Sequence, residues 1–269
     1  MLPDISIKVS VEIDMYIKET CIIKGIKEID KYKRMRKYVK GEKRGKKINE
    51  TSVAQKRINE RLAKKNKQRI IRANFEKGDL FITFTYQKSK RPKTKKTITK
   101  DRKDLIDRIR KALQKQGIEF KYVCVTEIGV KGAVHHHILI KSCDTSVFSK
   151  AWSKGSTHIQ YIYSEDLERL AAYMTGDKID DEDKTKHECV FEGWSRSRNL
   201  IVPEVKRERI SAKSFSKIPR PEKGTRIVDL RQGVNAYGYE YQSYKLVPDE
   251  RPERKKLEKI RENERKNNG

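Results

Sequence analysis

Three apolar runs rich in β-branched and aromatic residues constrain the fold of this chain more than any other feature of its sequence. They occupy residues 80–86, 120–129 and 133–142, and runs of this length and composition are typical of buried strands. A segment with apolar residues at helical spacing, 99–116, separates the first run from the second, and Gly132 marks a turn between the second and the third. A strand, a helix and then a hairpin of strands is the element order of an α+β domain.

Other segments show the same two periodicities on either side of this region. Alternation of apolar and polar residues predicts strands, and apolar residues three or four positions apart predict helices. We expect Thr99 to cap the helix that ends at Gly117. A polar, basic tract over 31–49 is expected to be a loop or a disordered segment. The remaining predicted elements are a strand over 5–15, a basic helix over 52–75, a short helix over 148–154, a strand over 157–163 and a helix over 166–175.

A large excess of positive charge indicates a polyanionic partner. The chain has 65 Lys and Arg residues against 38 Asp and Glu, for a formal net charge of +27. Nucleic acid is the commonest polyanion that a soluble basic protein meets, and charge alone leaves DNA and RNA equally open. Residues 1–75 and the loop over 87–96 are expected to contact phosphates. The basic side chains of this loop are Lys88, Lys90, Arg91, Lys93, Lys95 and Lys96.

Cysteine spacing and hydropathy argue against several other classes of protein. The four cysteines form no CxxC pair, which disfavours a zinc knuckle or a disulfide framework and fits a reducing cytosol. The first residues lack the apolar core of a signal peptide, and no stretch approaches the length of a membrane span. We therefore expect a cytoplasmic protein without a membrane partner.

A histidine cluster inside an apolar strand is the first candidate for chemistry. Successive side chains of a strand point to opposite faces, so His135 and His137 share one face and His136 points to the other. Glu127, on the preceding strand of the hairpin, can lie beside the pair. Two imidazoles and one carboxylate suit Mn²⁺ or Mg²⁺ and leave coordination positions open for a substrate. A structural role for the histidines, and a solvated Glu127 at its strand end, remain the alternative interpretations.

Tyr173 is the candidate nucleophile. It lies late on the predicted helix over 166–175, and Lys178 follows just past the end of that helix. A tyrosine hydroxyl that attacks a phosphodiester forms a covalent phosphotyrosine, and a nearby lysine adds positive charge. The alternative is a core tyrosine on an amphipathic helix, since the chain has 12 tyrosines.

Several stretches together resemble the HUH replication initiators of bacterial rolling-circle plasmids and phages. That family has an FxTLTY-like first motif, a His-hydrophobic-His second motif, and a third motif with a tyrosine and a lysine on a helix. Here His136 replaces the apolar middle residue, and the lysine follows the tyrosine by five positions. The stretches that carry the resemblance are NFEKGDLFITFTY, KYVCVTEIGVKGAVHHHILI, AWSKGSTHIQYIY, LERLAAYMTGDK and WSRSRNLIVP.

The resemblance implies an α+β fold with a central antiparallel sheet, RRM- or palm-like, and helices on its face. By this resemblance an HUH endonuclease domain spans 55–205, between a basic N-terminal extension, 1–54, and a basic C-terminal extension, 206–269. The residues that match the family's metal ligands, its nucleophile and its third-motif lysine are His135, His137 and Glu127, then Tyr173, then Lys178.

Such an enzyme nicks single-stranded origin DNA, keeps the 5′ phosphate on the tyrosine, leaves a 3′ hydroxyl for a host polymerase, and later rejoins the ends. The sequence has no GxxxxGK[ST] loop, so unwinding would fall to a host helicase. A conjugative relaxase or a single-strand transposase is the near alternative, with the same chemistry. A non-catalytic RRM-like module is the alternative of a different class. It predicts exposed aromatic residues for stacking on bases, from among Phe81, Phe84 and Tyr86.

Overall fold

The chain folds into two compact units, each with its own five-stranded antiparallel sheet. One unit, the inserted unit, consists of residues 48–202, and the other, the split unit, consists of residues 1–47 and 203–269. The expected α+β class is confirmed. The predicted strand over 5–15 lies outside the described residues. The computed structural model describes residues 16–33, 53–129, 131–176, 190–211, 218–235 and 238–249.

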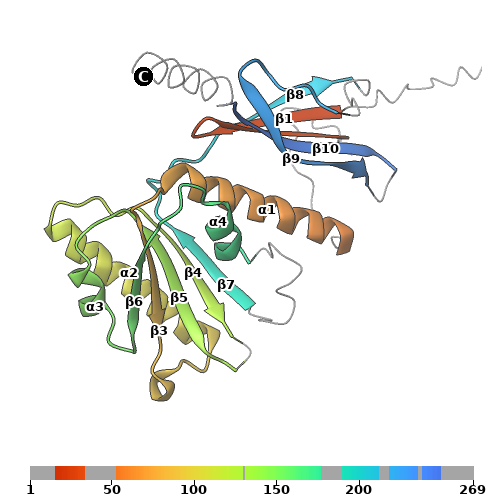
Figure 1. Cartoon of the computed structure of the whole chain (residues 1–269). Helices are drawn as coiled ribbons and strands as arrows, with labels where there is room; N and C mark the ends of the chain where they lie inside the picture. Colours follow the sequence, from red (N-terminus) through yellow and green to blue (C-terminus); the bar gives the residue numbers. More distant parts are fainter. Residues whose placement is uncertain are drawn as a thin grey trace, which may run out of the picture. The chain divides into compact units, whose positions relative to one another are not determined.

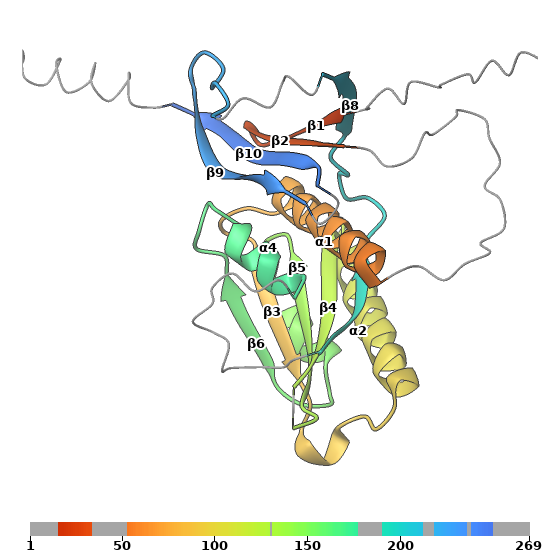
Figure 2. The same ribbon diagram turned by 90° about the vertical axis from the view of Figure 1, so that its right-hand side faces the viewer.

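The inserted unit is built around a sheet of order β6-β3-β5-β4-β7 (Figures 1 and 2). The strands and helices predicted between 52 and 175 are all present, with ends shifted by a few residues. The strands are β3 (Leu80–Thr85), β4 (Tyr122–Ile128), β5 (Val134–Ile140), β6 (Thr157–Tyr161) and β7 (Val190–Arg196). The helices are α1 (Val53–Asn74), α2 (Lys95–Lys115), α3 (Ser146–Ala151) and α4 (Glu168–Met174).

Helices cover both faces of this sheet, because its central strands carry apolar side chains on both sides. Cys124, Ile138 and Ile140 pack on one face with residues of α2 and α3. Val123 and Leu139, one position away on the same strands, pack on the other face with residues of α1 and α4. The same division is visible in Figure 1. Alternate side chains of one strand thus belong to an α2/α3 face or to an α1/α4 face.

The helix α2 begins earlier than predicted. Its first residue is Lys95, and Oγ1 of Thr94 accepts a hydrogen bond of 3.2 Å from the backbone N–H of Thr97. The prediction that Thr99 caps the helix is therefore wrong, because the hydroxyl of Thr94 already satisfies a free N–H one turn earlier. A short 3₁₀ helix, η1 (Lys88–Lys90), lies in the segment between β3 and α2.

The split unit draws its strands from both of the regions that were expected to be extensions. Its sheet has the order β8-β1-β2-β10-β9. Lys24 and Gly25 form the turn between β1 and β2 with φ angles of 47° and 81°, the left-handed region in which glycine is unstrained. The strands are β1 (Tyr16–Ile23), β2 (Ile26–Lys33), β8 (Val205–Ile210), β9 (Thr225–Val234) and β10 (Glu240–Pro248).

The prediction of a loop over 31–49 is wrong at its start, where residues 31–33 end strand β2. Nζ of Lys33 lies 3.9 Å from the centre of the Tyr239 ring, and Nζ of Lys31 lies 5.9 Å from that of Tyr244. These lysines pack along aromatic rings, so a strand of this sheet can be polar in sequence and still be ordered. The rest of the predicted loop lies outside the described residues.

The core of the split unit is small. Ile29, Tyr244 and Leu246 are buried together, with Ile227 packed against them. No helix in the described part of the whole chain has both the length and the apolar character that a membrane crossing requires.

Candidate active site

The hairpin of β4 and β5 brings the predicted metal ligands to one face of the sheet. Glu127 pairs with His135, and Val125 pairs with His137. Partners across an antiparallel ladder point to the same face, and so do residues two positions apart on one strand. Glu127, His135 and His137 therefore all lie on the α1/α4 face, to which Val125 contributes a core side chain.

Tyr173 reaches the same face from α4. Its hydroxyl donates a hydrogen bond of 2.8 Å to Oε2 of Glu127 and lies 3.2 Å from Nε2 of His137. Nε2 of His137 is itself 2.8 Å from Oε2 of Glu127, so the three polar atoms form a closed triangle. Tyr173 is 39% exposed, and a substrate can therefore approach this triangle from solvent.

Two residues of β3 that the sequence did not identify hold His137 in place. Oγ1 of Thr83 lies 3.1 Å from Nδ1 of His137, which leaves Nε2 to face Glu127. The ring of Phe81 stacks on His137 with 5.5 Å between ring centres and 5° between planes, and it meets Tyr173 edge-on at 6.2 Å. A hydroxyl that fixes one imidazole nitrogen sets the tautomer and the direction of the other.

The helix α1 holds the C-terminal end of α4, and with it Tyr173. Nζ of Lys64 donates to the backbone carbonyl of Gly176 at 2.7 Å. Nε2 of Gln68 donates to Oγ1 of Thr175 at 3.0 Å. The basic helix predicted over 52–75 therefore fixes the nucleophile candidate as well as carrying positive charge. Lys178, the predicted partner of Tyr173, lies outside the described residues.

His135 lies half-buried beside the triangle. Its ring centre is 6.2 Å from that of His137. Burial lowers the pKa of His135, and the neighbouring His137 and Arg91 lower it further, against the opposing effect of Glu127. A lowered pKa favours the neutral imidazole, which is the form that binds a metal ion. The effect of Arg91 also places the basic loop near this end of the site.

The donor atoms fit a divalent cation in kind, although no described group of three or more acidic, histidine or cysteine side chains already forms a closed set of ligands. Neighbouring ligands of an octahedral ion with bonds of 2.0–2.1 Å lie about 3 Å apart. Oε2 of Glu127 and Nε2 of His137 are separated by 2.8 Å, which is close to that spacing. His135 is the third donor on the same face. Imidazole nitrogen and carboxylate oxygen without thiolate suit Mn²⁺ or Mg²⁺.

On the α2/α3 face, His136 belongs to a buried chain of hydrogen bonds. Its Nδ1 lies 2.9 Å from Oγ1 of Thr126, and its Nε2 lies 2.9 Å from the hydroxyl of Tyr86. That hydroxyl donates to Oδ2 of Asp101 at 3.1 Å, and Asp101 pairs with Lys154. The single proton of Tyr86 goes to Asp101, so Nε2–H of His136 donates to Tyr86. Burial lowers the pKa of His136 to about 3, so this imidazole stays neutral.

We expect His136→Leu to lower the free energy of unfolding by about 2 kcal/mol. Thr126 and His136 are both fully buried, and leucine leaves the Thr126 hydroxyl without its partner, which costs about 1–3 kcal/mol. Urea unfolding followed by tryptophan fluorescence measures the loss. The matched control is the double variant His136→Leu, Thr126→Val, which removes the orphaned hydroxyl and is expected to recover part of the stability. A single variant as stable as the wild type contradicts this account of the network.

The basic loop before α2 is exposed along its length. Because Thr85 pairs with His135, the loop leaves β3 next to the histidine strand. Nζ of Lys90 donates to the backbone carbonyl of Ser153 at 3.0 Å. All six predicted DNA-contacting side chains are on the surface, and the last two of them belong to the first turn of α2. The exposed side chains are Lys88, Lys90, Arg91, Lys93, Lys95 and Lys96.

A comparison with known protein families gives a match over the middle of the chain. Residues 79–178 match the model of a family described as replication-associated protein, of the ORF2 type. The match covers less than half of the chain and contains Phe81, Thr83, Glu127, the three histidines and Tyr173. No similar chain was found among curated proteins, and none among solved structures.

Proposed function

We propose that the inserted unit is the strand-nicking and strand-joining domain of a replication initiator, with Tyr173 as the nucleophile. One observation carries the proposal: the Tyr173 hydroxyl donates to Glu127 at 2.8 Å, beside His137, in a solvent-accessible position. The match of residues 79–178 to a replication-associated family supports the biological setting. The formal net charge of +27 supports a nucleic-acid substrate.

The reaction that these residues suit is a transesterification. The Tyr173 oxygen attacks the phosphorus of a phosphodiester, its proton passes to the Glu127 carboxylate, and the bond from phosphorus to the 3′ oxygen breaks. The leaving 3′ oxygen takes up a proton and becomes a hydroxyl that a polymerase can extend. The 5′ phosphate stays on the tyrosine. Because one phosphodiester replaces another, the reverse attack by a 3′ hydroxyl rejoins the strand without ATP.

Each neighbouring residue has a definite task in this reaction. Phe81 and Thr83 fix the ring of His137, so that Nε2 faces the reacting atoms. The fixed geometry reduces the entropy that must be lost at the transition state. Glu127, His135 and His137 would hold Mn²⁺ or Mg²⁺, which when bound polarises the scissile phosphate. The exposed loop over 88–96 supplies positive charge for the backbone of the strand.

A relaxase or a single-strand transposase would use the same residues for the same chemistry. The non-catalytic RRM-like alternative is less well supported, because Phe84 and Tyr86 are buried in the core of the α2/α3 face. Phe81 is partly buried and stacks on His137. These rings are therefore not available as a platform for bases.

An adduct assay with end-labelled DNA tests the proposal. Single-stranded oligonucleotides of random internal sequence, labelled at the 3′ end, are incubated with the full chain and Mn²⁺. The expected result is an SDS-resistant labelled protein band that EDTA prevents, because the 3′ fragment carries the 5′ phosphate bound to the tyrosine. The same pool labelled at the 5′ end is expected to give only a free labelled fragment. A labelled protein with the 5′ label alone, or no adduct with either label, overturns the proposed reaction.

A further inference from the structure

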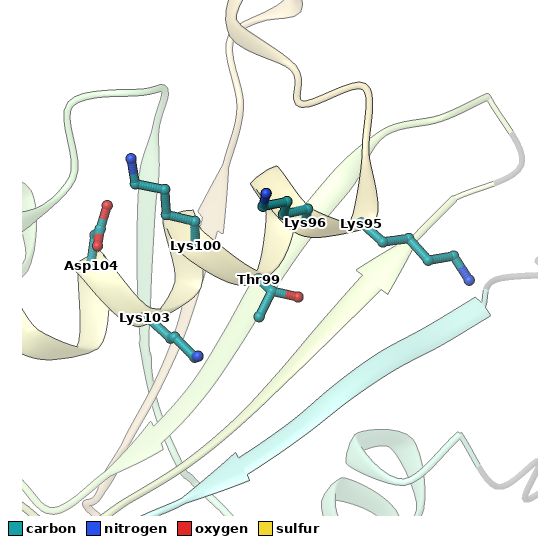
Figure 3. A pocket seen from close by; sticks show the side chains of 6 residues that line it. All are labelled: Lys95, Lys96, Thr99, Lys100, Lys103 and Asp104. Carbon is teal, nitrogen blue, oxygen red and sulfur yellow. The ribbon is translucent and has the colours of Figure 1, made fainter.

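The solvent side of the first half of α2 forms an open, shallow hollow with a strong positive charge. We call it the lysine hollow; Figure 3 shows its side chains along the helix. Four of the six lining residues are lysines and one is acidic. The residues are Lys95, Lys96, Thr99, Lys100, Lys103 and Asp104.

The charge of the lysine hollow is not neutralised within the described part of the protein. No described carboxylate pairs with Lys96, Lys100 or Lys103, and all three are exposed. They recur at helical spacing, so their ammonium groups lie on one side of the helix and repel each other. Further along the same helix, Arg110 does pair with Asp107. The row of lysines in the first half therefore favours an external anion.

The spacing of the row suits a repeating anion. Seven residues from Lys96 to Lys103 cover about 10 Å of helix, with Lys100 between them. A chain of phosphates can meet several such charges at once, whereas a single small anion cannot. The alternative is an ordinary solvated helix face, which predicts no loss of affinity for any polyanion when these lysines are changed.

The lysine hollow and the nicking site lie on opposite faces of the sheet. Leu105 and Ile109 of α2 pack with Cys124 on the α2/α3 face, whereas Ala171 and Met174 of α4 pack on the α1/α4 face. The basic loop leaves β3 beside the histidine strand and leads directly into α2. Positive charge thus continues from the site, around the end of β3, to the far face.

We propose that the lysine hollow binds the phosphate backbone of a DNA segment that flanks the nicked nucleotides. This inference rests on the proposed function for the identity of the DNA, but not for the existence of the binding surface. The surface adds affinity without reading sequence, since ammonium groups contact phosphates and no base edges. The flank can be single-stranded or duplex, and the two are separated by experiment.

The test compares two double variants of the full chain that remove equal charge from one helix. Lys100→Gln with Lys103→Gln changes the hollow. Lys111→Gln with Lys115→Gln is the matched control, since both of those lysines are also exposed on α2. Affinity for fluorescent DNA is measured by anisotropy at several salt concentrations. The probes are a short single strand, a long single strand and a duplex.

The hollow variant is expected to lose two phosphate contacts. Its slope of log affinity against log salt should become shallower by about 1.4 on a long single strand or about 1.8 on duplex DNA, and the control should keep the wild-type slope. The probe that shows the difference identifies the flank. Equal slopes for the two variants, or an unchanged slope with every probe, overturn the proposal. If the hollow variant loses binding as expected while the wild type forms no adduct, only the proposed nicking reaction fails.

Discussion

The Tyr173→Phe protein is expected to bind single-stranded DNA as the wild type does and to form no covalent adduct. Phenylalanine keeps the ring that meets Phe81 edge-on, and removes only the oxygen that lies 2.8 Å from Glu127. Loss of the attacking atom removes the covalent route itself, so nicking should fall by at least about a thousandfold. The measurement is the SDS-resistant band, with peptide mapping of the wild-type adduct.

Tyr161→Phe is the matched control for this experiment. Tyr161 ends β6 in the same unit and is 62% exposed, so the substitution also removes one accessible phenol. It is expected to keep full adduct formation. A full-strength adduct in the Tyr173→Phe protein, or a wild-type adduct that maps to another tyrosine, shows that the nucleophile has been misassigned.

The double variant His135→Ala, His137→Ala is expected to lose Mn²⁺ binding, with an affinity at least about a hundredfold lower. Two of the three proposed ligands are gone, and Glu127 alone is a weak site. Isothermal calorimetry measures the affinity. Because His137 is 5% exposed and stacks on Phe81, the variant also loses packing. Its folding must therefore be verified by circular dichroism before titration.

His158→Ala tests the choice of ligands in the same assay. His158 pairs with Thr83 across β3 and β6, so it lies on the same face as His137 but with β3 between their strands. It is expected to keep the wild-type Mn²⁺ affinity. Unchanged affinity in the double variant, or a loss in His158→Ala, would move the metal site away from the residues assigned to it.

The hairpin of β4 and β5 could be predicted from the sequence because its information is local. A tight turn and period-two alternation together determine which residues of two neighbouring strands share a face. His135, His137 and Glu127 needed nothing else. Apolar spacing placed Tyr173 on a helix, whereas its approach to Glu127 required the fold.

The residues that sequence reasoning missed depend on pairings between distant segments. Thr83 and His137 are 54 positions apart, and alternation in β3 does not reveal which of its faces meets β5. Likewise, the contact of Lys64 with Gly176 spans 112 positions. Alternation correctly predicted that His136 lies on the opposite face, but its bonds to Thr126 and Tyr86 come from the packing of α2 against the sheet.

The split unit was harder to predict because its strands are polar. The strand β8 reads VKRERI, and its residues are exposed or half-buried along an edge of the sheet. Charged residues on an edge strand prevent pairing with other chains, but in a sequence they resemble a solvated tail. Without a partner strand nearby in the chain, neither alternation nor turn chemistry distinguishes the two.

The split sheet also dictates an order of events during synthesis. Asp30 and Ser243, hydrogen-bonded across β2 and β10, are 213 positions apart, so β1 and β2 leave the ribosome about 10–40 s before their partner. A two-stranded hairpin is marginally stable by itself, whereas the inserted unit has all of its described strands by residue 202. The nascent chain therefore completes the domain that carries Tyr173 first, and a ribosome that stalls before β8 releases a folded inserted unit behind an unpaired hairpin.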